Sequence, residues 1–516
     1  MKSGLALFLV WLSSAAFAAE NIGAAEDIGP LIGAVRDGNS IVRQEAVEAL
    51  GTTNDSRAID PLVGALRDGN PEVRRKAAGA LGALNDPRAV GPLIDALKDD
   101  DSAVRWAAST ALGGMGKTAL EPLIAASKDG ESAVRRGAIQ ALGDIEEPTI
   151  IGPLIAAFRD SDAGVRGEAA ETLGNRGDLR AVEPLAEALK DSDASVQWDA
   201  AVALGRLKDA RAAPFLIAAL KDSEVGFRAQ VTEALVAIGP LAAESLVAAL
   251  SDGDPDIQSG AGDALVRIGR AAVEPLIAAF KDDEPRSRNA AAEALSAIGR
   301  AAVDPLMAAL RNDHPGIRSG AAKVLGRLKE RRAAEPLAVS LTDSESAVRI
   351  QAAKALENIK DPRSVDPLTA ALRDPDKGVR AQASLALAAI GAPAVEPLIA
   401  ALRDADWRVR WEAASTLGMI QDPRAADAIN MRAKEAVSTA DAYVEFIKKA
   451  EAGTEDGLLD ALGALGNTGM ARDFLGCGNP KLEEAGRRWL ENHDYTTSNL
   501  PRIRKGPRWG GRPIGR

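Results

Sequence analysis

The sequence predicts an all-α fold, an α-solenoid of about thirteen helix-turn-helix repeats, and two observations lead to this prediction. Only 3% of the residues are aromatic whereas 46% are hydrophobic, so the core has to be built from small aliphatic side chains. A fixed period of roughly 30 residues is typical of stacked repeats. A Pro-Leu pair or its equivalent recurs with this period, at Pro30, Pro61, Pro92, Pro122, Pro153, Pro184, Pro214, Ser245, Pro275, Pro305, Pro336, Pro367 and Pro397.

Residues 1–18 have the features of a secretory signal peptide. Lys2 is a positive start, residues 5–12 are apolar, and Ala16-Phe17-Ala18 fits a cleavage site. The apolar run is short for a membrane span, and we find no later segment that is long and uncharged enough for one. We therefore expect cleavage after Ala18 and a soluble mature chain that is exported to the periplasm, the cell surface or the medium. The alternative is an uncleaved anchor or a buried first helix.

The first half of each repeat predicts a short helix. In residues 86–99, "DPRAVGPLIDALKD", Asp86 is placed to cap this helix and Pro87 to occupy its first position. Pro92 lies about one turn further in, where it removes a backbone hydrogen bond. We therefore expect a bend at this proline in each repeat that carries it.

The second half predicts another helix, antiparallel to the first. In residues 102–115, "SAVRWAASTALGGM", Ser102 can cap the helix and Gly113 can end it. At 100° per residue, one arc of this helix varies little between repeats and is expected to be buried, and the opposite arc is expected to be exposed. The buried arc holds Val104, Ala108, Ser109, Ala111 and Leu112, and the exposed arc holds Trp106, Ala107 and Thr110.

A polar pair also recurs, in which an aspartate that ends the first helix is followed six residues later by an arginine. The arginine falls beside the buried arc, where a charge has to be paired. Gln197 and Gln258 replace the arginine, and Asn312 replaces the aspartate, so three pairs are weakened. The intact pairs include Asp37/Arg43, Asp68/Arg74, Asp99/Arg105, Asp129/Arg135, Asp160/Arg166, Asp222/Arg228 and Asp404/Arg410.

The pattern AVEPLIAALKD…VRxxAAxALGxIG, which covers residues 25–424, resembles HEAT repeats of the phycobilisome-lyase-like subtype. The resemblance implies that the aspartate–arginine pairs form a structural ladder between neighbouring repeats, and that the second helices line a concave surface. We divide the chain into a signal peptide (1–18), a solenoid of thirteen repeats (19–424), a degenerate helical cap (425–495) and a disordered basic tail (496–516).

Tryptophan recurs at one exposed position of the second helices, in Trp106, Trp198 and Trp411. Under the resemblance these side chains face the concave surface, where exposed tryptophans are candidates for binding a partner. The alternative is that each covers neighbouring alanines as extra packing. Another exposed position is acidic in some repeats and basic in later ones, in the order Glu171, Glu233, Asp263, Glu293, Lys323 and Lys354.

Signals for chemistry are weak. The net charge of −11 argues against a general nucleic-acid binder. Related repeats occur in deoxyhypusine hydroxylase, but its iron-binding His-Glu pairs have no counterpart here, where the histidines are His314 and His493. Residues 252–256 resemble the start of a calcium loop, yet Ile257 replaces the required glycine and Asp263 the bidentate glutamate. Cys477 is the single cysteine, so we predict no disulfide within the chain. We also predict no catalytic residue, no metal site and no cofactor.

The sequence therefore favours an exported, monomeric scaffold that binds another protein or an envelope polymer through its concave surface. One alternative is a tetrapyrrole (bilin-type) lyase or chaperone, since such lyases share the repeat subtype. The other is a cell-surface structural protein that attaches through its basic tail, which contains Arg502, Arg504, Lys505, Arg508, Arg512 and Arg516.

Overall fold

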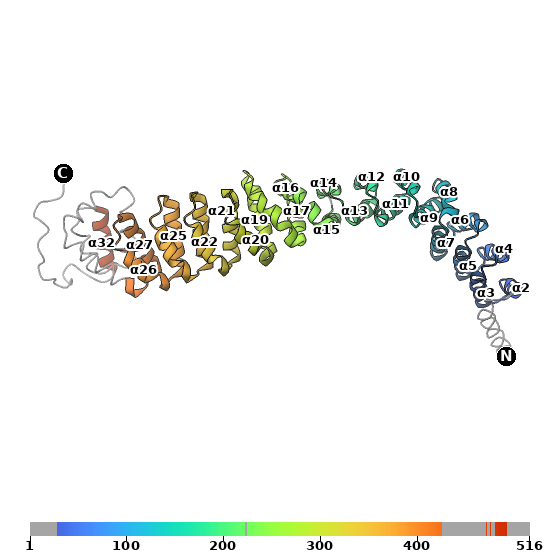
Figure 1. Cartoon of the computed structure of the whole chain (residues 1–516), viewed down its shortest axis with the longest axis horizontal. Coiled ribbons are helices and arrows are strands. Elements are labelled where there is room, and N and C mark those ends of the chain that lie inside the picture. Colours follow the sequence, from blue (N-terminus) through green and yellow to red (C-terminus); the bar gives the residue numbers. More distant parts are fainter. Residues whose placement is uncertain (1–27, 222–223, 426–470, 472–474, 476–479, 493–516) are drawn as a thin grey trace, which may run out of the picture. The chain divides into compact units, whose positions relative to one another are not determined.

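The computed structural model describes residues 28–221, 224–425, 471, 475 and 480–492. Within these residues every regular element is an α-helix or a short 3₁₀-helix, arranged as thirteen consecutive pairs of a first and a second helix (Figure 1). The predicted all-α solenoid is therefore confirmed. The chain divides into two compact units, one that ends at Ile268 and one that begins at Gly269.

The first unit contains eight helix pairs. Its first helices are α2 (Gly29–Ala34), α4 (Ile59–Ala65), α6 (Val90–Ala96), α8 (Lys117–Ala126), α10 (Ile151–Ala156), α12 (Val182–Ala188), α14 (Ala213–Ala218) and α16 (Ala243–Ala249). Its second helices are α3 (Ser40–Thr52), α5 (Pro71–Leu84), α7 (Ser102–Gly114), α9 (Ser132–Gly143), α11 (Ala163–Arg176), α13 (Ala194–Leu207), α15 (Val225–Ile238) and α17 (Pro255–Ile268).

The second unit contains five helix pairs and one further helix. Its first helices are α18 (Val273–Ala278), α20 (Val303–Ala309), α22 (Ala334–Ser340), α24 (Val365–Ala371) and α26 (Val395–Ala401). Its second helices are α19 (Pro285–Ile298), α21 (Pro315–Leu328), α23 (Ser346–Ile359), α25 (Lys377–Ile390) and α27 (Trp407–Ile420), and α32 spans Pro480–Asn492.

In most repeats the first half is a 3₁₀ turn followed by a short α-helix, rather than one bent helix. An exception is α8, a single α-helix that carries Pro122 in its interior, where the proline does remove a backbone hydrogen bond. Asp86 accepts a hydrogen bond from the Arg88 N–H at 2.9 Å and so caps the turn η3 (Pro87–Ala89). Pro92 is the third residue of α6, in the first turn of the helix, where an N–H has no partner within that helix. The expected loss of a hydrogen bond at this proline is therefore wrong.

The predicted buried arc of the second helix is confirmed, because its five residues in α7 are all buried. On the opposite arc, Trp106 and Thr110 are exposed, as predicted. Ala107 was predicted to be exposed but is buried. The reason is that second helices also pack side by side, so α5 and α9 bury the flanks of α7 as well as its inner arc.

The glycine of the Ala-Leu-Gly motif is a packing residue and does not end the helix. α7 continues through Gly113 to Gly114, and the left-handed residue that follows is Gly116 (φ +57°). A Cβ atom on Gly82 would lie 2.6 Å from the Ala111 Cβ, so this glycine lets α5 and α7 approach closely. The same close approach occurs at the pairs Gly51/Ala80, Gly174/Ala203, Gly205/Ala234 and Gly326/Ala355.

One repeat has a different register from the predicted one. In α14, Leu216 is fully buried and Phe215 is exposed. Leu216 therefore corresponds to the leucine of the Pro-Leu pair, and Phe215 stands where other repeats have proline. The step from Pro184 then runs to Phe215 rather than to Pro214, which makes this repeat one residue longer than the sequence pattern indicates.

The stretch Val225–Ala249 is long and apolar enough to qualify as a membrane span, contrary to the expectation that no such segment follows the signal peptide. Half of its most apolar window is buried. It comprises α15, a 3₁₀ turn and α16, and its Leu235 and Leu246 side chains are fully buried within the first unit. We therefore assign its apolar character to the repeat core.

Candidate functional site

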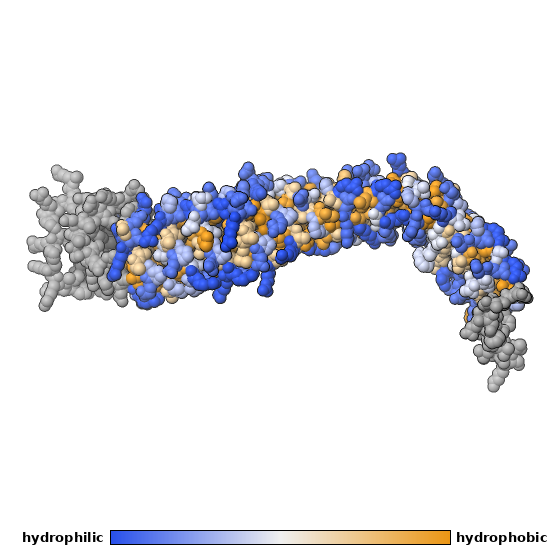
Figure 2. Space-filling view, in the orientation of Figure 1, coloured by the Kyte–Doolittle hydropathy of each residue, from blue (hydrophilic) through white to orange (hydrophobic). Residues whose placement is uncertain are grey.

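In each unit the second helices present a row of side chains on the side opposite the first buried residue, which we call the second-helix face, and some of these side chains, such as Ala107, are buried by the neighbouring second helices. It consists of the second, third and sixth residues after the first buried side chain of each second helix, as in Trp106, Ala107 and Thr110 after Val104. Figure 2 shows hydrophobic residues along the middle of each unit, between hydrophilic margins, on the side turned to the reader.

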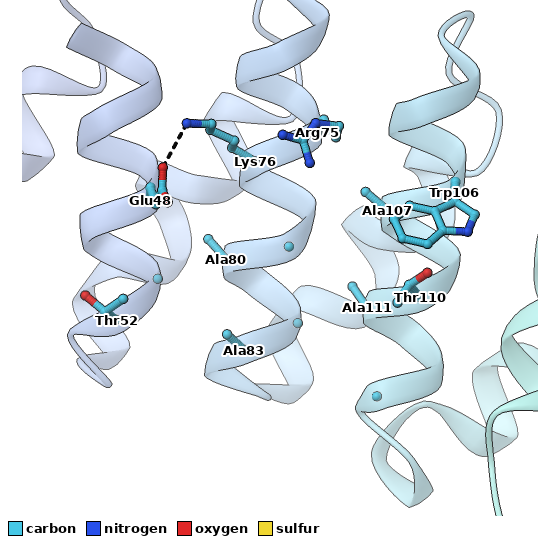
Figure 3. A pocket seen from close by; sticks show the side chains of 14 residues that line it. Glu48, Thr52, Arg75, Lys76, Ala80, Ala83, Trp106, Ala107, Thr110 and Ala111 are labelled. Atoms are coloured by element: carbon cyan, nitrogen blue, oxygen red, sulfur yellow. Dashed lines mark hydrogen bonds and ion pairs between the residues drawn. The ribbon is translucent and has the colours of Figure 1, made fainter. Parts of the chain in front are cut away.

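An open cleft of about 520 Å³ crosses this face where α3, α5 and α7 lie side by side (Figure 3). The floor of the cleft is made almost entirely of glycine and alanine, because the motif that packs the second helices against one another carries no large side chain. The floor residues are Gly51, Gly79, Ala80, Gly82, Ala83, Ala107, Ala111 and Gly114. The cleft therefore gives a ligand access to helix backbones.

The cationic side chains of the cleft, Arg75 and Lys76, both come from α5. Lys76 donates to Glu48 Oε2 at 2.8 Å, and Arg75 lies on the side of α5 that faces α7 (Figure 3). The Nε and Nη2 atoms of Arg75 donate to Glu72 at 2.8 and 2.5 Å. Its Nη1 atom makes no hydrogen bond within the described part of the chain. The cleft thus keeps unused cationic N–H donors.

The three tryptophans singled out in the sequence differ in exposure. Trp106 forms one wall of the cleft and is 59% exposed. Trp198, three repeats later on α13, is 43% exposed. Trp411 on α27 is half-buried. The first two lie on the second-helix face of the same unit and leave much of an indole in solvent.

Carboxylates on α11 and α13 lie near Trp198, in contrast to the cations of the cleft at Trp106. Glu168 and Asp199 occupy equivalent positions on α11 and α13, and Glu171 lies one turn from Glu168. Gly167 makes room for Asp199, because a Cβ atom there would be 2.7 Å from Asp199 Oδ2. Burial, reinforced by the charge of Glu171, raises the pKa of Glu168 to about 7, and burial also raises the pKa of Asp199.

The recurring arginine forms a ladder, but with a different aspartate from the one paired with it in the sequence. Arg74 donates to both carboxylate oxygens of Asp99, in the next repeat, at 2.7 Å each. From Asp68, six residues before it, Arg74 uses only the backbone carbonyl, at 2.9 Å. The rungs with this geometry are Arg43–Asp68, Arg74–Asp99, Arg135–Asp160, Arg166–Asp191, Arg318–Asp343 and Arg349–Asp374.

At Asp68, Asp160 and Asp191 the hydrogen bond of the rung lowers the pKa of the aspartate. The hydrogen bond from Arg43 is the main cause at Asp68, and that from Arg135 at Asp160. Both partners are largely buried, so the ladder holds neighbouring repeats together through desolvated ion pairs.

Every complete rung joins residues that are 25 positions apart, and the shorter repeats reduce this separation by one. Within the described residues, Arg105 contacts no carboxylate and donates only to the carbonyls of Asp99 and Asp100. Asp129 is the corresponding aspartate of the next repeat, and it lies one position closer to Arg105 in sequence than the aspartate of a complete rung lies to its arginine. Arg228 pairs instead with Asp256 at 3.3 Å, and Arg380 approaches Glu412 at 3.7 Å. The rung therefore depends on repeat length.

The remaining predicted ladder positions fit the same picture. Arg410 donates to the Asp404 carbonyl, while the Asp404 carboxylate pairs with Arg373. Gln197 and Gln258 keep the carbonyl contact, to Asp191 and Asp252. Gln258 and Asn312 both belong to repeats that are one residue shorter. In such repeats even an arginine and an aspartate do not form a rung with the geometry of Arg74–Asp99. Asp222 lies outside the described residues.

Sequence reasoning missed a second ladder at the start of the first helices. Arg88 pairs with the Asp86 carboxylate and also donates to the Ser56 carbonyl of the preceding repeat at 3.0 Å. The Asp-x-Arg spacing was visible in the sequence. The hydrogen bond from Arg363 lowers the pKa of Asp361 to about 2. Other examples are Asp55/Arg57, Asp178/Arg180, Asp209/Arg211 and Asp422/Arg424.

The described residues contain no group of three His, Cys, Asp or Glu side chains arranged to hold a metal ion. Asp252 and Asp254 each accept backbone N–H bonds that shape the turn before α17. His314 caps α21 by accepting from the Gly316 N–H. Cys477, His493 and the residues of the predicted signal peptide and basic tail lie outside the described residues.

Comparison with known proteins agrees with this architecture. The family description "HEAT repeats" matches residues 13–71, 27–113, 59–143, 120–201, 151–236, 243–321, 303–388 and 365–442. No curated protein matches the chain. Among solved structures, Kap121p is 15% identical, with a TM-score of 0.36, over 85% of this chain and 57% of its own. Importin beta is 16% identical, with a TM-score of 0.31, over 95% and 76%. The chain thus spans little more than half the length of Kap121p.

Proposed function

The chain belongs to the HEAT-repeat family, and on this premise we propose that it is a scaffold that binds another protein through its second-helix face. The observation that carries the proposal is the exposure of Trp106 and Trp198 on the second-helix face, where Trp106 lies beside a surface of glycine and alanine. An indole that is half in solvent gains contact area when a partner covers it, and tryptophan is enriched among the residues that dominate binding energies.

The framework supports this role because it holds the face in a fixed arrangement before a partner arrives. Glycine–alanine contacts set the distance between second helices, and the arginine–aspartate rungs lock neighbouring repeats at the helix ends. A surface that is ordered in advance loses less conformational entropy on binding than a flexible one.

We further propose that the protein acts outside the cytoplasm, with residues 1–18 as a cleaved signal peptide, and that its partner is a protein or polymer of that compartment. The short repeat period and the Ala-Leu-Gly motif support its assignment to the phycobilisome-lyase-like subtype of HEAT repeats. The basic tail provides a second, electrostatic means of attachment to anionic polymers.

The scaffold proposal is tested with two aromatic residues of nearly equal exposure. Trp198 on α13 is 43% exposed on the second-helix face, and Phe215 on α14 is 44% exposed on a first helix. The full chain is immobilised and used to capture partners from the envelope fraction of its host. We expect Trp198→Ala to lose the captured partner and Phe215→Ala to retain it, at unchanged melting temperatures. Retention by Trp198→Ala together with loss by Phe215→Ala would place the binding surface elsewhere.

A further inference from the structure

We propose that the cleft at Trp106 binds an extended peptide segment in which an apolar anchor residue is flanked on both sides by acidic residues. The inference rests on the proposed scaffold function and specifies the chemistry of the partner at one place on the second-helix face. It is carried by the row that Arg75, Trp106 and Arg136 form at equivalent positions of α5, α7 and α9.

The row follows from the register of the repeats. Each of the three residues comes two positions after a buried valine: Val73, Val104 and Val134 respectively. Because α7 packs against α5 on one side and α9 on the other, the exposed indole stands between two arginines. An apolar partner side chain can cover the indole and the alanines below it, since those alanines leave the cleft open.

The charge of this part of the face favours an anionic partner. Arg136 is exposed and forms no ion pair in the described residues. Its guanidinium lies beside Gly164 at the start of α11, and its charge also acts on Glu168 of that helix. Arg75 and Lys76 are neutralised by Glu72 and Glu48, yet the Arg75 Nη1 group still offers N–H donors toward a ligand. Carboxylates are the natural acceptors for guanidinium groups, with which they form short, charge-assisted hydrogen bonds.

The spacing of the helices sets the register of the partner. Packed helices lie about 8–10 Å apart, and an extended chain advances about 3.3 Å per residue. A segment that runs across the row from Arg75 to Arg136 therefore places its acidic residues about three positions before and after the anchor. A helical segment advances about 1.5 Å per residue, so it would need its acidic residues about six or seven positions from the anchor, and the selected spacing therefore distinguishes the two conformations.

The surroundings of Trp198 oppose the same partner. Glu171 and Asp199 make that stretch acidic, and Glu168 adds its charge above its pKa of about 7, so an acidic segment is repelled there and attracted at Trp106. The two tryptophans thus provide a matched comparison within one unit: the same side chain on the same face, in environments of opposite charge.

The experiment selects peptides from a displayed library of random sequences on the immobilised full chain. With the unmodified protein we expect enrichment of peptides that carry an aromatic or large aliphatic residue, with Asp or Glu about three positions to either side. Binding of these peptides to Trp106→Ala should be at least about tenfold weaker. Phe215→Ala, which removes an exposed aromatic side chain from a first helix of the same unit, should bind them as the unmodified protein does.

A charge-reversed protein makes the result independent of folding defects. Selection on the double variant Arg75→Glu/Arg136→Glu should replace the acidic residues of the enriched peptides by Lys or Arg at the same spacing. The proposal is overturned if no enriched peptide depends on Trp106, if the flanking residues are basic, or if charge reversal leaves the selection unchanged. If any one of these three results is obtained while Trp198→Ala still loses the partner captured from the envelope fraction, this inference fails and the proposed scaffold function stands.

Discussion

Replacing Arg74 by alanine removes one complete rung of the arginine–aspartate ladder, and the next residue provides the control. Arg74 donates two hydrogen bonds to the Asp99 carboxylate and one to the Asp68 carbonyl. Arg75 carries the same charge on the same helix, but it pairs with Glu72 three residues away at the surface. The two substitutions are chemically identical and differ only in what the guanidinium contacts.

The difference in the free energy of unfolding can be estimated from exposure. The Arg74 and Asp99 side chains are 16% and 12% exposed, so Arg74→Ala leaves a nearly buried carboxylate with only the Asp101 N–H as a donor. Breaking a buried ion pair costs about 3–5 kcal/mol, and residual solvent contact favours the lower end, about 3 kcal/mol. Arg75 and Glu72 are 37% and 43% exposed, so Arg75→Ala should cost no more than about 0.5 kcal/mol.

A third variant tests the dependence on repeat length. Sequence pairing alone marks Arg105 as a ladder residue, but the structure gives it two carbonyl partners and no carboxylate within the described residues. Arg105→Ala should therefore cost about 1 kcal/mol, between the other two. Urea unfolding combined with hydrogen exchange of the α5 and α7 amides measures both global and local stability. Equal losses for Arg74→Ala and Arg75→Ala, or a larger loss for Arg105→Ala than for Arg74→Ala, would refute the assignment of the rungs.

Three further results are expected. The pKa of Glu168 is raised from 4.5 to about 7, so between these pH values the native state keeps a proton that the unfolded state has released. The free energy of unfolding should therefore fall by up to about 3 kcal/mol as the pH rises from 4.5 to about 7. Glu168→Gln should abolish this pH dependence in urea titrations. Gly82→Ala should destabilise the protein by about 1–3 kcal/mol, because the added methyl group clashes with the neighbouring helix α7. Gly79→Ala has open space around it and should stabilise the protein by up to about 1 kcal/mol. If both substitutions change the melting temperature in the same direction, the packing role of Gly82 is contradicted. Protein from the native host should begin at Ala19 in N-terminal sequencing, and an intact Met1 would exclude cleavage after Ala18.

The sequence was sufficient for the fold class because the period of the repeat and the helical arc of small aliphatic residues depend only on local spacing. The buried residues of α7 followed from Val104 and a rotation of about 100° per residue. The burial of Ala107 could not be predicted in this way, because it depends on the packing of second helices side by side. A rotation of about 100° per residue describes one helix alone and contains no information on its neighbours. The close-packing role of Gly82 was missed for the same reason.

For the ladder, the residue types were predictable and the partners were not. The spacing of six residues joins Asp68 to Arg74 along the chain, yet it is the side chain of Asp99, 25 positions ahead, that receives the arginine. That contact depends on how the next repeat is placed relative to the arginine. A change of one residue in repeat length is enough to disrupt the contact. The cleft at Trp106 was only partly foreseen, since its glycine and alanine floor forms between three helices.

The central claim, that partners bind to the second-helix face, is tested most directly by a photo-crosslinking residue placed at position 198 or at position 215 of the full chain in its native host. The two positions lie in the same unit and are almost equally exposed, so they are equally accessible to chance encounters. The account predicts a discrete covalent adduct with a partner from position 198 and none from position 215. An adduct from position 215 alone, or the same adducts from both, would contradict it.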